Sequence, residues 1–374
     1  MAVSDMKKKL TELSKAYKSL SKAEFTRSGS VVLDAILGGG IPRGVFILWS
    51  AENGCGKSTG ALHISRAFCM QGKKVLYLDY GGGVNTSQIE GIGLSDYLYS
   101  PEENPDGNFI LYQVQTYKDA ESIFDQIMED VDLVIIDSAT AMLTEKVKGS
   151  SSEDSLPGLD SRVMSTFLKK YKAEAVRSGV SWIIINQIRT KIATGYGQHT
   201  HDEEAGGNAL KFYPDVRLQM KKAYKGTLTR VEETASGDQE VPFGSICSIY
   251  AVKNRYERSN IPLSIAIIFG KGISNEFAYY DFLMGAGAIE KKGGWYNISV
   301  NGEEAKVQGV NRVVEWIYQH KSLVRDYINE HGGYRLLMKE DSKVDLGVDV
   351  EPEEDVYASD STVEDSFEVD GDEE

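Results

Sequence analysis

The residue pattern with the clearest chemistry runs from Ala51 to Thr59, with the sequence AENGCGKST. It follows the template G-x-x-x-x-G-K-[ST], in which a glycine-rich turn joins a strand to a helix and binds phosphate. Backbone N–H groups of such a turn, with the positive end of the following helix, attract phosphate oxygens. The pattern therefore predicts a nucleotide phosphate site made of Glu52, Asn53, Gly54, Cys55, Gly56, Lys57, Ser58 and Thr59.

Single residues of this loop have distinct expected roles. Lys57 would reach the β- and γ-phosphates, and Ser58 would ligate Mg²⁺. Ala51 departs from the template glycine, but alanine is small and is tolerated where φ is negative. Cys55 resembles a nucleophile, yet no histidine and asparagine pattern surrounds it in the sequence, so we expect a small loop residue instead.

Asp137 provides a second part of the same chemistry. It ends the apolar run DLVIIDS at 132–138, as the aspartate that holds Mg²⁺ does in P-loop ATPases. An aspartate at a strand end is common, so the signal is weak alone and becomes strong beside the phosphate loop. We therefore expect ATP with Mg²⁺ held by Ser58 and Asp137.

These side chains need a scaffold in which strands alternate with helices. Apolar runs predict strands at 44–50, 74–80, 132–138 and 182–187, and helical patterns fall at 58–70, 123–128 and 162–177. This alternation predicts an α/β fold with a mostly parallel central sheet covered on both faces. The runs at 216–220, 245–252 and 263–269 have little helix between them and are expected to be antiparallel additions at one edge.

The acidity of the chain is concentrated at its end. The 374 residues carry a net charge of −15, and residues 340–374 contain 16 acidic residues and one basic residue, Lys343. The rest of the chain is therefore neutral, so the net charge does not exclude a nucleic-acid partner. Low hydrophobicity and high charge predict a disordered tail.

Other classes of protein are excluded by composition. Three cysteines cannot form a disulfide framework and fit a reducing compartment. No apolar run approaches the roughly 18 residues of a membrane span, and no apolar segment follows Lys7–Lys9 as in a signal peptide. We expect a soluble cytoplasmic protein without a membrane partner. Residues 199–202 (HTHD) contain metal-ligand types, but ligand type alone does not make a metal site.

The two ends of the chain differ from the middle. Met6, Leu10, Leu13, Tyr17 and Leu20 recur at helical spacing and predict an amphipathic helix at 4–22. Periodicity alone favours packing on its own domain and leaves open an arm that docks on a neighbouring subunit. Residues 275–335, with a glycine-rich turn at 293–296 and a helical stretch at 310–328, predict a small α/β module.

Several blocks together resemble the RecA family of homologous-recombination ATPases, including phage recombinases of the UvsX type. The resemblance covers about residues 28–300 and is most specific in INQIRTKI at 185–192 followed by GGNALKFY at 206–213. The other blocks are Ser28-Gly29-Ser30 with Leu33-Asp34, LDY at 78–80, VIIDS at 134–138, Lys253-Asn254-Arg255 and Gly294-Trp295-Tyr296. The resemblance implies an oligomerisation arm at 1–27, a RecA-like ATPase core at 28–272, a small C-terminal α/β domain at 273–338 and a disordered acidic tail at 339–374.

The resemblance also implies roles around the nucleotide. Gln187 matches the glutamine that senses the γ-phosphate. Lys253 and Arg255 match the pair that reaches across the subunit interface to the neighbour's ATP, as arginine fingers do in trans. Asn85 and Gln88 stand where the family often contacts adenine.

One departure from the family concerns hydrolysis. The glutamate that activates the attacking water falls at Gly81 in this sequence, and glycine cannot act as a base. Either another carboxylate such as Asp79 or Glu52 substitutes, or hydrolysis is strongly slowed while ATP binding and assembly remain. We take slowed hydrolysis as the hypothesis.

For DNA, the resemblance implies a first loop near 145–157 and a second from about 188 to 208. Arg162 and Lys169 lie seven residues apart, so both charges project from one helix face. The implied DNA-binding residues are Arg162, Ser165, Lys169, Arg189, Lys191, Tyr196, Gly206, Gly207 and Asn208. The implied subunit interface contains Leu10, Leu13, Tyr17, Lys211 and Phe212.

The predicted function is an ATP-dependent homologous-recombination protein. It would form a helical homo-oligomer on single-stranded DNA and pair that strand with homologous duplex DNA, with mediator or single-strand-binding proteins as further candidate partners. The alternative is a nucleotide-gated, non-hydrolysing DNA-coating filament, which Gly81 supports. A phage origin would place the protein in the host cytoplasm. The acidic tail either solubilises the protein or competes with DNA for its basic surface.

Overall fold

The computed structural model describes residues 23–142, 159–191, 201–204, 208–234 and 237–331. The expected N-terminal helix at 4–22, the first DNA loop at 145–157 and the acidic tail lie outside these ranges. So do His199 and Thr200 of the segment with metal-ligand types. Within the described ranges, no helix has the length and apolar character needed to cross a membrane.

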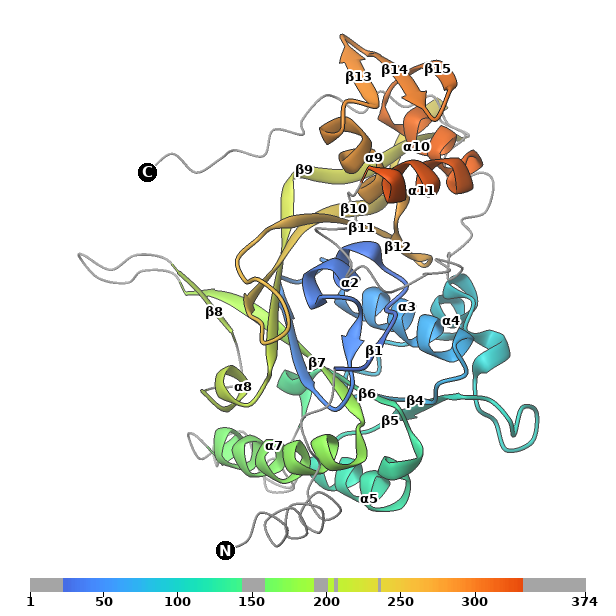
Figure 1. Cartoon of the computed structure of the whole chain (residues 1–374). Helices are drawn as coiled ribbons and strands as arrows, with labels where there is room; N and C mark the ends of the chain where they lie inside the picture. The colour runs from blue at the N-terminus through green and yellow to red at the C-terminus, as the bar shows by residue number, and fades with distance from the viewer. Residues whose placement is uncertain (1–22, 143–158, 192–200, 205–207, 235–236, 332–374) are drawn as a thin grey trace, which may run out of the picture.

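One large sheet forms the centre of the molecule (Figure 1). Its strands follow the order β12-β11-β10-β9-β3-β7-β6-β4-β5. The strands from β9 to β5 pair in parallel, and β10, β11 and β12 continue the sheet with antiparallel pairing. The bounds are β3 (Phe46–Ala51), β4 (Val75–Asp79), β5 (Phe109–Gln113), β6 (Leu133–Asp137), β7 (Ser181–Lys191), β9 (Val216–Thr234), β10 (Gly237–Lys253), β11 (Leu263–Ile268) and β12 (Gly272–Ser274). The predicted α/β fold with a mostly parallel central sheet is confirmed.

Strand β9 corrects one expectation. Residues 216–220 pair in parallel with β3 rather than antiparallel at an edge, and the antiparallel pairing begins with the hairpin partner β10. Both strands are also longer than expected, since their ladder extends to the pair Thr234 and Gly237. Their outer parts carry charged and polar residues instead of an apolar run, so the sequence gives no strand signal there.

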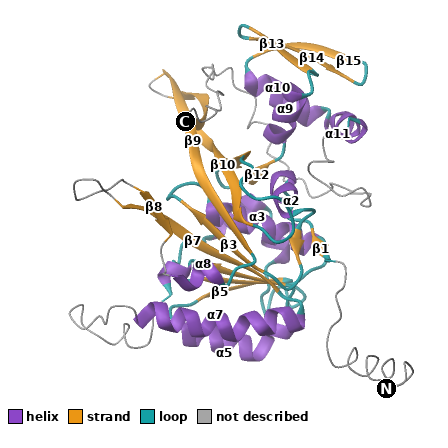
Figure 2. Cartoon of the chain, turned by 60° about the vertical axis from the view of Figure 1, so that its left-hand side comes forward, coloured by secondary structure: helices purple, strands orange, loops and turns teal. Residues whose placement is uncertain are grey.

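Helices cover both faces of the parallel strands (Figure 2). One face carries α2 (Val31–Leu37), α3 (Lys57–Met70) and α4 (Thr86–Ile92), and the other carries α5 (Tyr117–Ile127) and α7 (Leu159–Ser178). Alternate residues of β3 serve the two faces: Ile47 and Trp49 pack in the cluster that contains α3, and Phe46 and Leu48 pack in the cluster that contains α5 and α7. Burial on both faces explains the continuous apolar runs of these strands.

Shorter elements connect the main ones. Strands β1 (Phe25–Thr26) and β2 (Ile41–Pro42) form a small separate sheet, and β8 (His201–Glu204) pairs with β7 outside the main strand order. The 3-10 helices are η1 (Ser95–Tyr97), η2 (Met128–Asp130) and η3 (Ala139–Ala141), and α8 (Asn208–Phe212) precedes β9. Strand β5 and helix α4 were not expected from the sequence.

The C-terminal part contains a three-stranded antiparallel sheet and three helices. Its elements are α9 (Glu276–Gly285), β13 (Ile289–Lys292), β14 (Trp295–Val300), β15 (Glu303–Gln308), α10 (Val310–Gln319) and α11 (Lys321–Glu330). The expected helix at 310–328 is divided because His320 leaves the helical conformation, with φ −114° and ψ 30°. The apolar residues of this part belong to the same buried cluster as those around α3, so the two parts share one core.

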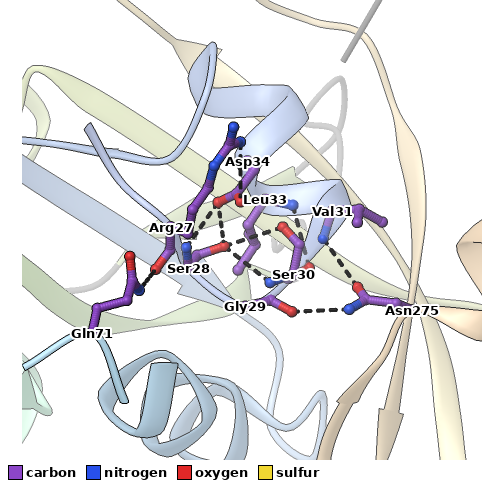
Figure 3. A network of polar contacts seen from close by, with 9 residues as sticks. All are labelled: Arg27, Ser28, Gly29, Ser30, Val31, Leu33, Asp34, Gln71 and Asn275. Carbon is purple, nitrogen blue, oxygen red and sulfur yellow. Dashed lines mark hydrogen bonds and ion pairs between the residues drawn. The ribbon is translucent and has the colours of Figure 1, made fainter. Parts of the chain in front are cut away.

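Asn275 joins this C-terminal part to the beginning of α2 (Figure 3). Its Nδ2 donates a hydrogen bond to the carbonyl oxygen of Gly29 at 2.9 Å. Its Oδ1 accepts one from the N–H of Val31 at 3.0 Å. A single side chain therefore satisfies a donor and an acceptor of a segment 244 and 246 residues away in the sequence.

Asp34 stabilises the same segment through contacts with its own neighbours in sequence (Figure 3). One carboxylate oxygen of this buried residue accepts hydrogen bonds from the N–H of Ser28 at 2.9 Å and from its hydroxyl at 2.6 Å. The other oxygen lies 3.6 Å from the guanidinium of Arg27. Gln71, just beyond α3, donates to the carbonyl oxygen of Arg27 at 2.9 Å. The network thus connects α2, α3 and the start of α9.

We expect Asn275→Ala to lower the free energy of unfolding by about 1–3 kcal/mol, because the N–H of Val31 is left buried without its partner. Urea denaturation followed by circular dichroism measures this change. Asn329→Ala, the same substitution at an exposed position of α11, is the control and should have little effect. Equal midpoints for the two variants would contradict the assignment.

Candidate nucleotide-binding site

The phosphate loop leaves the carboxyl end of β3 and enters α3 at Lys57. Gly54 and Gly56 have left-handed φ values of 79° and 78°. A Cβ atom on Gly56 would lie 2.6 Å from Cγ2 of Ile267, so both conformation and space require glycine at this position. Ala51 is the buried last residue of β3. Because a strand position needs no glycine, its departure from the template is accounted for.

Lys57, the first residue of α3, binds the backbone at the start of this loop. Its Nζ donates hydrogen bonds to the carbonyl oxygens of Ala51 at 3.0 Å and Glu52 at 2.8 Å. Burial lowers the pKa of Lys57, while nearby negative groups oppose the change. The ammonium group is therefore held beside the backbone of the loop, where the sequence places its contact with phosphate.

Asp137 and Ser58 meet next to the loop, as predicted. Asp137 accepts a hydrogen bond from the Ser58 side chain, and its Oδ2 accepts one from the Tyr77 hydroxyl at 2.7 Å. Burial raises the pKa of Asp137, and the hydrogen bonds from Ser58 and Tyr77 oppose this rise. The peptide bond between Asp137 and Ser138 is cis. A hydroxyl and a carboxylate are oxygen ligands of the kind Mg²⁺ prefers, so this pair fits the expected metal.

Tyr77 was missed by the sequence reasoning. It is fully buried in β4, and burial raises the pKa of its hydroxyl well above the usual value. The hydroxyl therefore stays protonated and donates to Asp137. Tyr77 lies on the same face of its strand as Asp79, and Asp79 is the register partner of Asp137. This position was the signal that Tyr77 could reach Asp137.

Parallel register brings Gln187 to the same edge of the sheet. Gln187 of β7 pairs with Ala51, the residue at which the phosphate loop begins, and its side chain is half-buried. The structure therefore places the expected γ-phosphate sensor beside the loop, although its role stays a prediction.

The turn after β4 is organised by Asp79. This buried carboxylate accepts hydrogen bonds from the N–H groups of Gly81 at 3.1 Å, Gly83 at 3.3 Å and Val84 at 3.0 Å. Both of its oxygens are engaged, so Asp79 is poorly suited to replace the family's catalytic glutamate. Gly81 itself is exposed, and a Cβ added there would meet only an Asp79 oxygen at 3.8 Å.

Asn85 and Gln88 have a local structural role at the start of α4. The Asn85 side-chain oxygen accepts from the N–H of Gln88 at 3.0 Å, and the Gln88 side-chain oxygen accepts from the N–H of Asn85 at 3.1 Å. This reciprocal capping box satisfies two N–H groups that a helix start leaves without helical partners. The expected contact of these residues with adenine stays a prediction.

The expected DNA-binding residues are divided among several elements. Arg162 and Lys169 are exposed on α7, with Ser165 half-buried between them. The second loop does not begin at 188 as expected, because β7 continues to Lys191 and pairs antiparallel with β8 through residues 188–191 and 201–204. Arg189 and Lys191 are thus strand residues and Asn208 begins α8. Tyr196, Gly206 and Gly207 lie outside the described residues, as do Leu10, Leu13 and Tyr17 of the expected interface.

Lys253 and Arg255 lie away from the phosphate loop of their own chain. Lys253 is the register partner of Arg217, which pairs with Leu48, three residues before Ala51. Lys253 is therefore displaced from Ala51 by about 10 Å along the strands and by two strand spacings of ~4.8 Å across them. Arg255 lies two residues farther along the chain, so a single subunit does not join this pair to its own loop.

Asp215, which the sequence reasoning also missed, binds the groups around Arg255. The buried carboxylate binds Arg255 at 3.0 Å, the ammonium group of Lys172 and the N–H of Phe46 at 3.1 Å. Lys172 lies 43 residues away in the sequence, so no local pattern announces the pair.

The expected interface residues of α8 lie next to the groups around Arg255. Lys253 Nζ donates to the carbonyl oxygens of Phe212 at 3.2 Å and Pro214 at 2.5 Å. The Phe212 side chain is 74% exposed, and Lys211 is half-buried. A large exposed ring beside exposed Arg255 is typical of a protein contact surface.

The chain is similar in sequence to known proteins over most of its length. A model of the RecA N-terminal domain matches residues 4–274. Protein RecA of Nostoc punctiforme is 30% identical over 345 residues, which cover 89% of each chain. Protein RecA of Bordetella pertussis is 32% identical over 308 residues, covering 81% of this chain and 80% of that protein. A crystal structure of the RadB recombinase is 21% identical with a TM-score of 0.47, and covers 67% of this chain and 98% of its own.

The chain belongs to the RecA family. The family model spans the phosphate loop, Asp137, Gln187 and the pair Lys253 and Arg255, so the predicted site lies inside the matched region.

Tyr77→Phe should raise the Mg²⁺ concentration needed for half-maximal ATP binding by about 10-fold, because groups that hold a metal ligand in place contribute on this scale. Titration of a fluorescent ATP analogue with Mg²⁺ measures the change. Tyr112→Phe, on the exposed face of β5, is the matched control. An unchanged Mg²⁺ dependence in Tyr77→Phe would show that the hydroxyl does not position Asp137.

Proposed function

We propose that the protein is an ATP-dependent DNA strand-exchange protein. It polymerises on single-stranded DNA with Mg-ATP between subunits and pairs the bound strand with homologous duplex DNA. The arm at 1–27, the core at 28–272, the module at 273–338 and the tail at 339–374 are parts of the same proposal. Leu10, Leu13 and Tyr17 would dock on the next subunit.

The main support for the proposal is the distance between the phosphate loop and the pair Lys253 and Arg255. The phosphate loop lies at the carboxyl end of β3, whereas Lys253 and Arg255 lie nearer the other end of the sheet, beside exposed Phe212. A second copy of the chain would supply the missing cations if its Arg255 surface met this loop. ATP placed between subunits then couples nucleotide binding to assembly, as a filament on DNA requires.

The proposed DNA surface fits sequence-independent binding. Exposed Arg162 and Lys169 offer charge to phosphates, and such contacts give affinity that falls with salt but carry no sequence information. A strand-exchange protein needs this property, because base pairing between the strands reads homology. Arg189, Lys191, Tyr196, Gly206, Gly207 and Asn208 belong to the same proposed surface.

The deciding experiment is D-loop formation from single-stranded DNA and homologous supercoiled duplex, with ATP and with a non-hydrolysable analogue. We expect nucleotide-dependent D-loops for the parent chain and at least a ~10-fold loss in Arg255→Ala, because this cation would act on the neighbour's ATP in trans. Arg258→Ala, exposed three residues away, is the control and should retain activity. ATP binding by the isolated subunit should stay unchanged in both. Coating of single-stranded DNA without D-loops in the parent would favour the structural alternative.

Gly81 favours a second candidate function, a nucleotide-gated DNA-coating filament that does not hydrolyse ATP. Position 81 lacks a carboxylate, and Asp79 is engaged with three backbone N–H groups. We propose that ATP binding and assembly remain while hydrolysis is slow, a property that both candidate functions accommodate.

Gly81→Glu is expected to raise DNA-dependent phosphate release by ~10²-fold, since a general base contributes about 10²–10⁴. The new side chain fits, because Gly81 does not have a left-handed φ and the space around its Cβ is open apart from Asp79. Gly81→Gln provides equal size without a base and should match the parent. If Gly81→Glu also matches the parent on single-stranded DNA, the slowed-hydrolysis hypothesis fails.

A further inference from the structure

Two of the three cysteines lie against each other at the phosphate loop. Cys55 belongs to the loop, and Cys247 is a buried residue of β10. Cys247 Sγ lies 3.8 Å from the carbonyl oxygen of Cys55, and the two thiols share a hydrogen bond. The contact joins residues 192 positions apart in the sequence, so the fold creates this pair.

The surroundings make the two thiols chemically unequal. The hydrogen bond from Cys247 lowers the pKa of Cys55 to about 7, with a smaller contribution from the Lys57 ammonium, and burial opposes the change. The same hydrogen bond and burial raise the pKa of Cys247. Of the two, Cys55 is the cysteine in which the thiolate, the nucleophilic form, is favoured, and Cys247 remains a thiol.

A small oxidant can approach from the loop side. Cys55 is only 1% exposed, but the preceding Asn53 and Gly54 are exposed. A Cβ built on Gly54 would meet no atom within 4 Å, so the loop residue directly before Cys55 borders open space. Cys69, the remaining cysteine, is buried in α3, and burial raises its pKa to about 12.

We propose that Cys55 and Cys247 form an oxidation site, at which hydrogen peroxide converts the thiol pair to a disulfide and abolishes nucleotide binding. The effect on nucleotide rests on the proposed function, whereas disulfide formation does not. The Cys55 thiolate attacks one peroxide oxygen, the O–O bond breaks, and the released hydroxide takes a proton to become water. Cys247 sulfur then attacks the Cys55 sulfenic acid, the S–O bond breaks, and the Cys247 proton leaves with hydroxide as a second water.

The disulfide would deform the loop that binds phosphate. Bonded sulfurs lie about 2.05 Å apart, much closer than hydrogen-bonded thiols, so Cys55 must move toward β10. Gly56, the next residue, already packs against Ile267 of β11, so a movement of Cys55 toward β10 would displace the loop N–H groups that are expected to meet phosphate. Nucleotide binding and oxidation therefore oppose each other: by linkage the disulfide is less favourable in the ATP-bound chain, and a loop held by phosphate would hinder the movement of Cys55 that the linkage requires.

The test uses the full reduced chain, with a fluorescent ATP analogue and Mg²⁺, before and after a small excess of hydrogen peroxide. We expect a Cys55–Cys247 linked peptide in the mass spectrum, a fall in affinity of at least ~10-fold, and recovery with dithiothreitol, since the N–H groups of the loop supply the phosphate contacts. Mg-ATP added before peroxide should delay the linkage. Cys247→Ala should keep its affinity after peroxide, and Cys69→Ala should behave like the parent.

The outcomes separate the inference from the proposed function. If the reduced chain does not bind the analogue, the proposed function fails while peptide mapping of the parent still decides whether the disulfide forms. If the analogue binds but no Cys55–Cys247 linkage appears, or if the linkage forms and affinity is unchanged, the inference is wrong. Peptide mapping of the parent chain and the measurement of protection by ATP need no variant. Both still test the inference if Cys247→Ala does not fold.

Discussion

Parallel pairing of β3, β7, β6 and β4 is the constraint on which the site depends. It places the carboxyl ends of four strands at one edge of the sheet, so Ala51 lies beside Gln187 and Asp79 lies beside Asp137. Residues from 51 to 187 meet only because their strands share this register. A shift of one residue in any of these strands would turn its polar end toward the opposite face, and the helices on both faces oppose such a shift by burying the apolar residues of the strands between them.

Four carboxylates removed from solvent each have a different set of hydrogen-bond partners. Asp34 and Asp79 accept backbone N–H groups and organise turns, whereas Asp215 binds two cations and one backbone N–H. Asp137 accepts hydrogen bonds from two hydroxyls, and burial raises its pKa. Since burial of an unpaired charge is costly, these partners indicate function: Asp34 and Asp79 shape the fold, while Asp137 is the member suited to a divalent cation.

Local patterns were enough to predict the phosphate loop, Asp137 and the parallel strands β3, β4, β6 and β7, because each depends on neighbouring residues and an apolar run. The glycine missing at Ala51 was a harmless departure, since that residue belongs to the strand. Tyr77, Asp215 and the pair Cys55 and Cys247 could not be predicted in this way, because their partners lie 40 or more residues away in the sequence. The length of β9 and β10 was also hidden, since cross-strand pairing rather than apolar character sustains their outer halves.

The contact between Gly56 and Ile267 has a mechanical consequence. Ile267 belongs to β11, its register partner Ile273 lies on β12, and Asn275 follows directly after that strand. The hydrogen bonds of Asn275 then reach Gly29 and Val31. Close-packed interiors transmit displacement instead of absorbing it. A displacement of Gly56 would therefore be passed through β11 and β12 to Asn275, at the junction between the sheet and the C-terminal helices. This junction is the point at which a change in the phosphate loop would alter the shape of the subunit.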